Sequence, residues 1–141
     1  MAMRFVSRRR LLQGTLGAAA VGWVMRGGTS GEGTAQAADK EHAATCSQKC
    51  RECAKTCQEC SKCCSGGDSK CCQTCLTCHH LCLACATACE GKGKLMAELC
   101  ALCEKQCLEC AARCEECGRD CCKDCAQRCR ECAAACRACR G

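Results

Sequence analysis

Residues 46–64 read CSQKCRECAKTCQECSKCC, and the spacing of their cysteines predicts how the chain folds. Leaving Cys63 aside, cysteine recurs after four, three, four, three and four residues. This alternation is the a/d spacing of a heptad repeat, which places each such residue on one stripe of an α-helix. Alanine, lysine, glutamate, glutamine and arginine fill most positions between, and these residues favour helix. The stretch therefore predicts a helix with one face of cysteine.

The same spacing returns along the rest of the chain, which has 27 cysteines among 141 residues. Four runs share it, and every cysteine is a predicted metal ligand. The runs are Cys46, Cys50, Cys53, Cys57, Cys60, Cys63 and Cys64; Cys71, Cys72, Cys75, Cys78, Cys82, Cys85 and Cys89; Cys100, Cys103, Cys107, Cys110, Cys114, Cys117 and Cys121; and Cys122, Cys125, Cys129, Cys132, Cys136 and Cys139.

Helix caps and turns separate the runs. The predicted helices run from an Asp39 cap to about Cys64, from a turn at residues 65–68 to about Glu90, from a turn at residues 91–93 to Gly118, and from an Asp120 cap onward. About twenty residues make a helix about 30 Å long. Short connections between helices of equal length predict an all-α fold, an antiparallel up-down-up-down four-helix bundle with a cysteine-lined core.

Hydrocarbon is too scarce to hold such a bundle together. From Ala38 onward the chain has no aromatic residue and only eight large apolar ones, seven leucines and Met96. Ordering each residue costs about 1–2 kcal/mol of backbone entropy. Cysteine itself is too small a hydrophobe to replace leucine throughout a core. The sequence therefore predicts that something bound by the cysteines stabilises the fold.

Three chemistries remain for the cysteine stripes. A disulfide-stapled structural protein is one, although neighbours on one helix have Cβ atoms about 5–6 Å apart and a disulfide needs about 3.5–4.5 Å. Zinc–thiolate or iron–sulfur sites are the second, and both need discrete sets of four ligands. Multiple Cu(I) ions are the third and the favoured one, because Cu(I) is soft, prefers thiolate and accepts two or three ligands. Ions of low coordination can repeat along a continuous tube of sulfur.

The N-terminal segment has the order of an export signal. Ser7-Arg8-Arg9-Arg10-Leu11-Leu12-Gln13 has the twin-arginine pattern, and an apolar run to Met25 follows that is too short to span a membrane. Residues 35–37 read AQA, an A-x-A cleavage site. We therefore predict a signal peptide at residues 1–37, a cysteine-rich bundle at residues 38–141, and a periplasmic or otherwise extracytoplasmic mature protein with no membrane segment.

Charge argues against nucleic acid as a partner. The formal charge of +6 arises mainly in the first 37 residues, and the remainder carries 16 basic and 14 acidic residues with the signs interspersed. The sequence shows neither the cluster of basic residues nor the aromatic residues for base stacking that are typical of nucleic-acid binding. No nucleophile–base constellation or phosphate loop appears either, so we predict a binding protein and not an enzyme.

From Ser7 to Cys139 the chain resembles the bacterial copper storage protein family, specifically its exported, twin-arginine-directed branch. The resemblance rests on the leader, the four-helix layout and spacing such as Cys46-x3-Cys50-x2-Cys53. It implies an antiparallel bundle that holds multiple Cu(I) ions through core thiolates. Copper would be passed to copper enzymes or chaperones, or kept away from other proteins. It also implies that copper enters at one end, where His and Met supplement the thiolates, and that bundles form a homo-oligomer.

Bundle topology places particular residues at each end. His42, Cys89, Met96 and Cys139 share one end, where Met96 and His42 are predicted ligands; a hydrophobic plug and a surface histidine are the alternatives. His79 is expected to face solvent beside the stripe, with a ligand to a core ion as the alternative, and His80 is expected on the outer face.

At the opposite end lie three cysteine doublets, residues 63–64, 71–72 and 121–122. Each doublet adds one thiol beyond the stripe, which predicts an extra metal cluster capping the tube. This departs from the simple family pattern and leaves the ion number open. Leucines beside the stripes of the second and third helices predict the contact between bundles.

Overall fold

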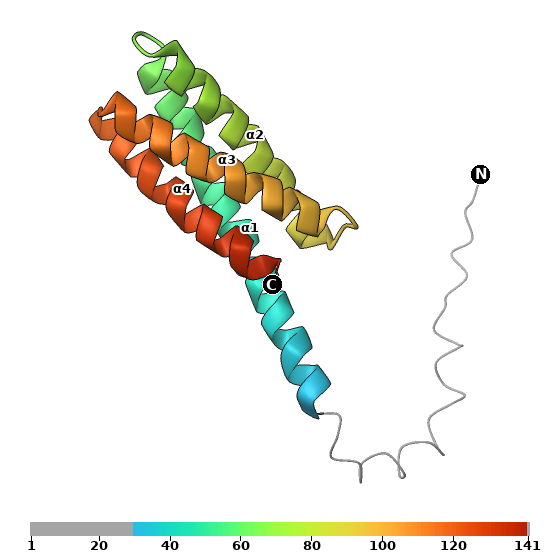
Figure 1. The fold of residues 1–141 in the computed structure, drawn as a ribbon. Coiled ribbons are helices and arrows are strands. Elements are labelled where there is room, and N and C mark those ends of the chain that lie inside the picture. Colours follow the sequence, from blue (N-terminus) through green and yellow to red (C-terminus); the bar gives the residue numbers. More distant parts are fainter. Residues whose placement is uncertain (1–29, 141) are drawn as a thin grey trace, which may run out of the picture. The chain divides into compact units, whose positions relative to one another are not determined.

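The computed structural model describes residues 30–140, with side chains from Ala37 onward. Four helices follow one another: α1 (Ser30–Cys64), α2 (Ser69–Gly91), α3 (Met96–Cys117) and α4 (Asp120–Cys139). The chain divides into two units, Met1–Gln36 and Ala37–Gly141, and the bundle lies in the second. Within that unit the four helices lie side by side (Figure 1).

Contacts between sulfur atoms establish the direction of the helices. Cys46, early in the bundle part of α1, has its Sγ 3.7 Å from that of Cys136 near the end of α4. Cys64, the last residue of α1, has its Sγ 3.3 Å from that of Cys122 near the start of α4. The two helices are therefore antiparallel, and the predicted all-α four-helix bundle is confirmed.

Two of the predicted helix ends are confirmed by their capping geometry. The side chain of Asp68 accepts a hydrogen bond from the backbone N–H of Cys71 at 3.0 Å and caps α2. Gly118 follows α3 with a φ of 72°, a left-handed conformation that glycine adopts without steric cost, and its N–H bonds to the carbonyl of Cys114.

Two other predicted caps are wrong. Asp39 lies inside α1, which begins at Ser30 and is 35 residues long. An aspartate can occupy a position in the middle of a helix when its side chain faces solvent, and Asp39 is exposed. Arg119, not Asp120, is the N-cap of α4. Asp120 is the first helical residue, where its negative charge interacts favourably with the positive end of the helix dipole.

Most of the predicted signal peptide lies outside the described residues. Residues 1–29, with the arginines and the apolar run, are among those the structure does not describe, and the predicted cleavage site at residues 35–37 lies within α1. In the described part of the chain, none of the helices is both long and apolar enough to cross a membrane.

The predicted cysteine stripes form the core. Of the 27 cysteines, 22 are buried free thiols. Buried alanines flank them, including Ala54, Ala86 and Ala111, each at most 1% exposed. Because alanine has only a methyl group, the helices approach closely enough for the small cysteine side chains to touch across the core. Sulfur and methyl groups thus replace the large aliphatic side chains of an ordinary bundle.

Candidate metal centre

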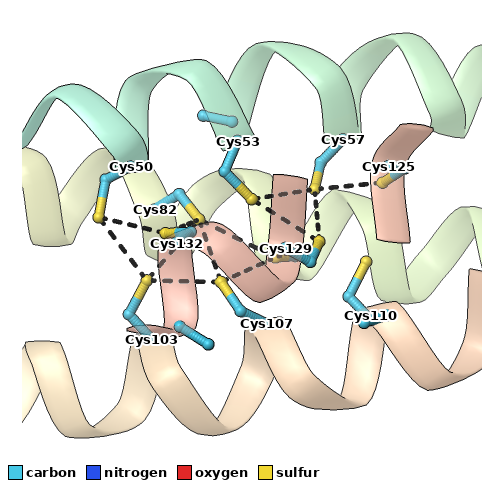
Figure 2. Close-up of a cluster of buried hydrophobic side chains, with 14 of the residues drawn as sticks. Cys50, Cys53, Cys57, Cys82, Cys103, Cys107, Cys110, Cys125, Cys129 and Cys132 are labelled. Carbon is cyan, nitrogen blue, oxygen red and sulfur yellow. Dashed lines mark hydrogen bonds between the residues drawn. The ribbon is translucent and has the colours of Figure 1, made fainter. Parts of the chain in front are cut away.

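The core sulfurs form a continuous file along the bundle. Figure 2 shows cysteines from all four helices pointing toward one another in the space between them. Along α1, the sulfurs of Cys53 and Cys57 are 3.8 Å apart. Between helices the spacing is similar, with 3.7 Å from Cys82 to Cys103. The file is thus built from sulfur contacts both along single helices and across the core.

Groups of four sulfurs recur in this file, with all members within 4.8 Å of one another. One such group is Cys53, Cys78, Cys82 and Cys107, drawn from three helices. Neighbouring groups share members: Cys53 belongs to this group and also to one with Cys57, Cys78 and Cys129. The core is therefore a series of overlapping thiol sites, in which one sulfur can serve two ions.

The sulfur spacing fits a thiophilic metal without large movement of the helices. Four thiolates at about 2.3 Å from a zinc ion lie about 3.8 Å from one another. The observed separations bracket this value, for example 3.6 Å between Cys50 and Cys132 and 4.0 Å between Cys50 and Cys103. The sulfur separations therefore fit zinc as well as copper.

Burial keeps many of these thiols protonated when no metal is bound. Desolvation raises the pKa of the Cys71 thiol and of the Cys122 thiol to about 12 each, from an ordinary value of 9.0. It also raises the pKa of Cys89 and Cys100. The thiolate is the form that binds metal, so a metal ion that binds these thiols displaces their protons.

One end of the bundle, here called the Met96 end, carries the group Cys46, Cys89, Cys100 and Cys139, one residue from each helix. Cys139 is half-buried, whereas the other three are buried. Met96 is half-buried and packs against the core sulfurs. His42 is exposed.

Carboxylates tie the helices together at the Met96 end, a feature that sequence reasoning missed. Glu104 of α3 is only 8% exposed and forms ion pairs with Arg137 and Arg140 of α4. The hydrogen bond from Arg137 Nε, at 2.8 Å, is the main reason that the pKa of Glu104 lies below its ordinary value of 4.5. The sequence holds only a partial signal: Glu104 follows Cys103 and two arginines flank Cys139, next to the cysteine stripes, but the pairing itself is not specified.

A second carboxylate makes the matching tie between α1 and α2. Glu90 accepts a hydrogen bond from the Ser47 hydroxyl at 2.6 Å and two from the Arg51 guanidinium at 2.7 Å each. These donors, the hydroxyl first, hold the pKa of Glu90 below its usual range. The Met96 end is thus held by charged hydrogen bonds on both helix pairs.

The histidines beside the stripe do not join the sulfur groups named above. His79 is half-buried, and its Nδ1 lies 2.7 Å from the backbone carbonyl of Ala54 on α1. The expected solvent-facing role is therefore corrected: the ring links α2 to α1. His80 is exposed, as predicted for the outer face.

The doublet end, formed by residues 63–64, 71–72 and 121–122, differs from the expected thiol cluster. Cys63 and Cys121 are joined in a disulfide, so neither is a free thiolate in this structure. Inside them, Cys64 lies 3.7 Å from Cys71 and 3.9 Å from Cys117, measured between sulfurs. The free thiols at this end thus continue the core file, and the disulfide lies beside it.

Comparison with known families adds an independent line of evidence. The model of a family described as copper storage protein matches residues 39–141. This range is most of the chain and includes all but the first two residues of the unit that forms the bundle. No curated protein matches the chain.

The Glu104 tie predicts a measurable loss of stability. Glu104→Ala is expected to lower the free energy of unfolding of the metal-free protein by about 1–3 kcal/mol, because two guanidinium groups lose a charged hydrogen-bond partner. Urea unfolding followed by circular dichroism measures the change. Glu109→Ala, at an exposed position on the same helix, is the matched control. Equal stability of the two variants would show that the tie contributes nothing.

Proposed function

The chain belongs to the copper storage protein family, and we propose that it stores its copper as many Cu(I) ions on the thiolates of the bundle core. Family membership makes it a storage protein and not an enzyme. The oxidation state, the large number of ions and the thiolate ligands are the parts that we propose. The overlapping groups of four buried sulfurs are the observation that carries the proposal.

Overlap favours Cu(I) over zinc or an iron–sulfur cluster. Zinc takes four ligands at each site, and an iron–sulfur cluster needs a separate nest of four cysteines, so the same thiols serve fewer of these sites than of a metal with two or three ligands. Sharing Cys53 between two groups suits an ion that needs only two or three ligands, because one thiolate can then bridge two ions. The single disulfide and 25 free thiols also argue against a disulfide-stapled structural protein.

We propose that copper enters at the Met96 end. Cys139 is the half-buried member of the group of four there, so an incoming ion meets it before the buried sulfurs. Met96 is half-buried and packs against the core, where its thioether can pass a soft ion inward. His42 is exposed and is the outermost of the proposed ligands.

We propose that the mature protein works outside the cytoplasm, after export by the twin-arginine route. The paired arginines, the apolar run and the A-x-A site in the first 37 residues support this proposal. Storage there would keep Cu(I) away from other proteins and supply copper enzymes or chaperones.

We also propose that bundles associate through the leucines of α2 and α3. Leu95 is 58% exposed, Leu102 53% and Leu108 45%. Leu83, Leu95 and Leu99 line a shallow groove beside the α2–α3 turn. Exposed leucines around a groove on an otherwise charged surface favour a protein contact.

A titration tests the storage proposal. We expect the reduced full chain, under nitrogen, to take up on the order of ten equivalents of Cu(I) from a chromophoric chelator, because its 27 thiols would be shared at two or three per ion. Cys78→Ser with Cys82→Ser should lower this capacity by a step, whereas Thr77→Ser, exposed on the same helix, should not. Uptake of one or two equivalents by the unmodified chain would contradict storage.

Export can be tested with the leader alone. Residues 1–37 fused to a folded fluorescent reporter should bring it to the periplasm of a bacterium that has the twin-arginine pathway. Arg8→Lys with Arg9→Lys should keep the reporter in the cytoplasm, and Arg4→Lys, outside the motif, is the control. Export of the double variant, or no export of any fusion, would count against this localisation.

Sedimentation tests the proposed assembly. The full chain should sediment as an oligomer, and Leu95→Gln with Leu102→Gln should shift it toward the monomer by removing exposed apolar area from the contact. Lys92→Gln with Lys105→Gln, also exposed near this face, should leave the oligomer intact. A monodisperse monomer for the unmodified chain would end the proposal.

A further inference from the structure

The doublet end separates its cysteines into an outer pair and an inner pair. The outer pair, Cys63 of α1 and Cys121 of α4, forms the disulfide, with Cα atoms 6.7 Å apart. Cys63 is exposed and Cys121 half-buried. The other 25 cysteines are free, and 22 of them are buried. The oxidised cysteines are therefore the two that solvent can reach at this end of α1 and α4.

The inner pair consists of the next residue on each helix, Cys64 and Cys122. Both are buried, and their sulfurs are 3.3 Å apart. Cys122 also lies 3.7 Å from Cys60, and Cys64 lies 3.7 Å from Cys71, so the inner pair is the last part of the core file. Two adjacent positions on each helix thus connect solvent to the storage thiols.

We propose that the outer pair is a Cu(II)-reducing site that supplies Cu(I) to the inner pair. Two Cu(II) ions each take one electron from the Cys63 and Cys121 thiols. The two S–H bonds break, one S–S bond forms, two protons leave to solvent, and two Cu(I) ions result. These ions then bind the free thiols of the inner pair. This inference rests on the proposed function, that the core holds Cu(I).

The location of the pair explains why it can give electrons at no cost to storage. A disulfide within the core would remove two metal ligands each time it formed. The outer disulfide is present together with 25 free thiols, so the oxidised product leaves the core file intact. A dithiol reductant of the medium can reopen an exposed disulfide by exchange, which makes the cycle repeatable.

Arg119 holds the two helix ends in place independently of the disulfide. Its Nη1 donates a hydrogen bond to the backbone carbonyl of Cys63 at 2.8 Å. Its guanidinium also lies close to Gly67 in the turn between α1 and α2. Because Arg119 is the N-cap of α4, this contact ties α4 to the end of α1. The thiols therefore remain opposite each other when the disulfide is reduced.

The test adds two equivalents of Cu(II) to the fully reduced full chain under nitrogen. Loss of the Cu(II) electron paramagnetic resonance signal gives the rate, and mass spectrometry of alkylated peptides identifies the disulfide. We expect rapid loss of the signal and a Cys63–Cys121 disulfide. Cys63→Ser with Cys121→Ser should slow the loss at least tenfold. Lys62→Ser with Asp120→Ser, at the exposed neighbouring positions, should match the unmodified chain.

Two results would overturn the inference: an unchanged rate in the cysteine double variant, or a disulfide that maps to core cysteines in the unmodified chain. The mapping does not depend on how well any variant folds. Supplying Cu(I) directly separates the two proposals. If the double variant binds Cu(I) but reduces Cu(II) at the unmodified rate, only the reducing site fails. If the unmodified chain binds no Cu(I), the storage proposal fails.

Discussion

The space between the four helices is filled by sulfur, and this one constraint governs the rest of the bundle. A cysteine side chain buries much less apolar area than leucine, so the core provides little hydrophobic free energy for its length. The helices compensate by close approach over buried alanines such as Ala54 and Ala111. Caps, ion pairs and the metal itself therefore carry a larger share of the stability than in a bundle with an aliphatic core.

Burial of so many thiols also couples metal binding to protonation and to folding. Desolvation favours the neutral thiol, as it does at Cys71 and Cys122. In the proposed loaded state, each Cu(I) ion offsets part of the negative charge of the thiolates that bind it, which lowers the cost of burying them. Copper then stabilises the folded chain by mass action, because the unfolded chain cannot reproduce the overlapping sites.

The two ends of the bundle are held by different chemistry, and the difference suits different tasks. At the Met96 end, Glu90 and Glu104 tie the helices by reversible charged hydrogen bonds, around sulfurs that include the half-buried Cys139. At the doublet end, a disulfide and the Arg119 contact hold α1 to α4. An end held by hydrogen bonds can open to admit an ion, whereas one closed by a covalent bond responds to redox agents.

The helices, their antiparallel order and the cysteine core could be predicted from sequence, because the signals for them are local. Heptad spacing places the cysteines of each helix on one face, and short turns make consecutive helices antiparallel, so the cysteine faces meet in the core. Asp68 and Gly118 could be identified as helix caps because each makes its capping hydrogen bond to a backbone group of its own helix. Tertiary structure alone decided which sulfurs share a group, that His79 reaches the carbonyl of Ala54, and that Glu104 pairs with arginines of another helix. It also decided that Cys63 and Cys121 bond while their neighbours stay free. Each of these depends on the rotation and separation of helices that are distant in sequence, which no local spacing specifies.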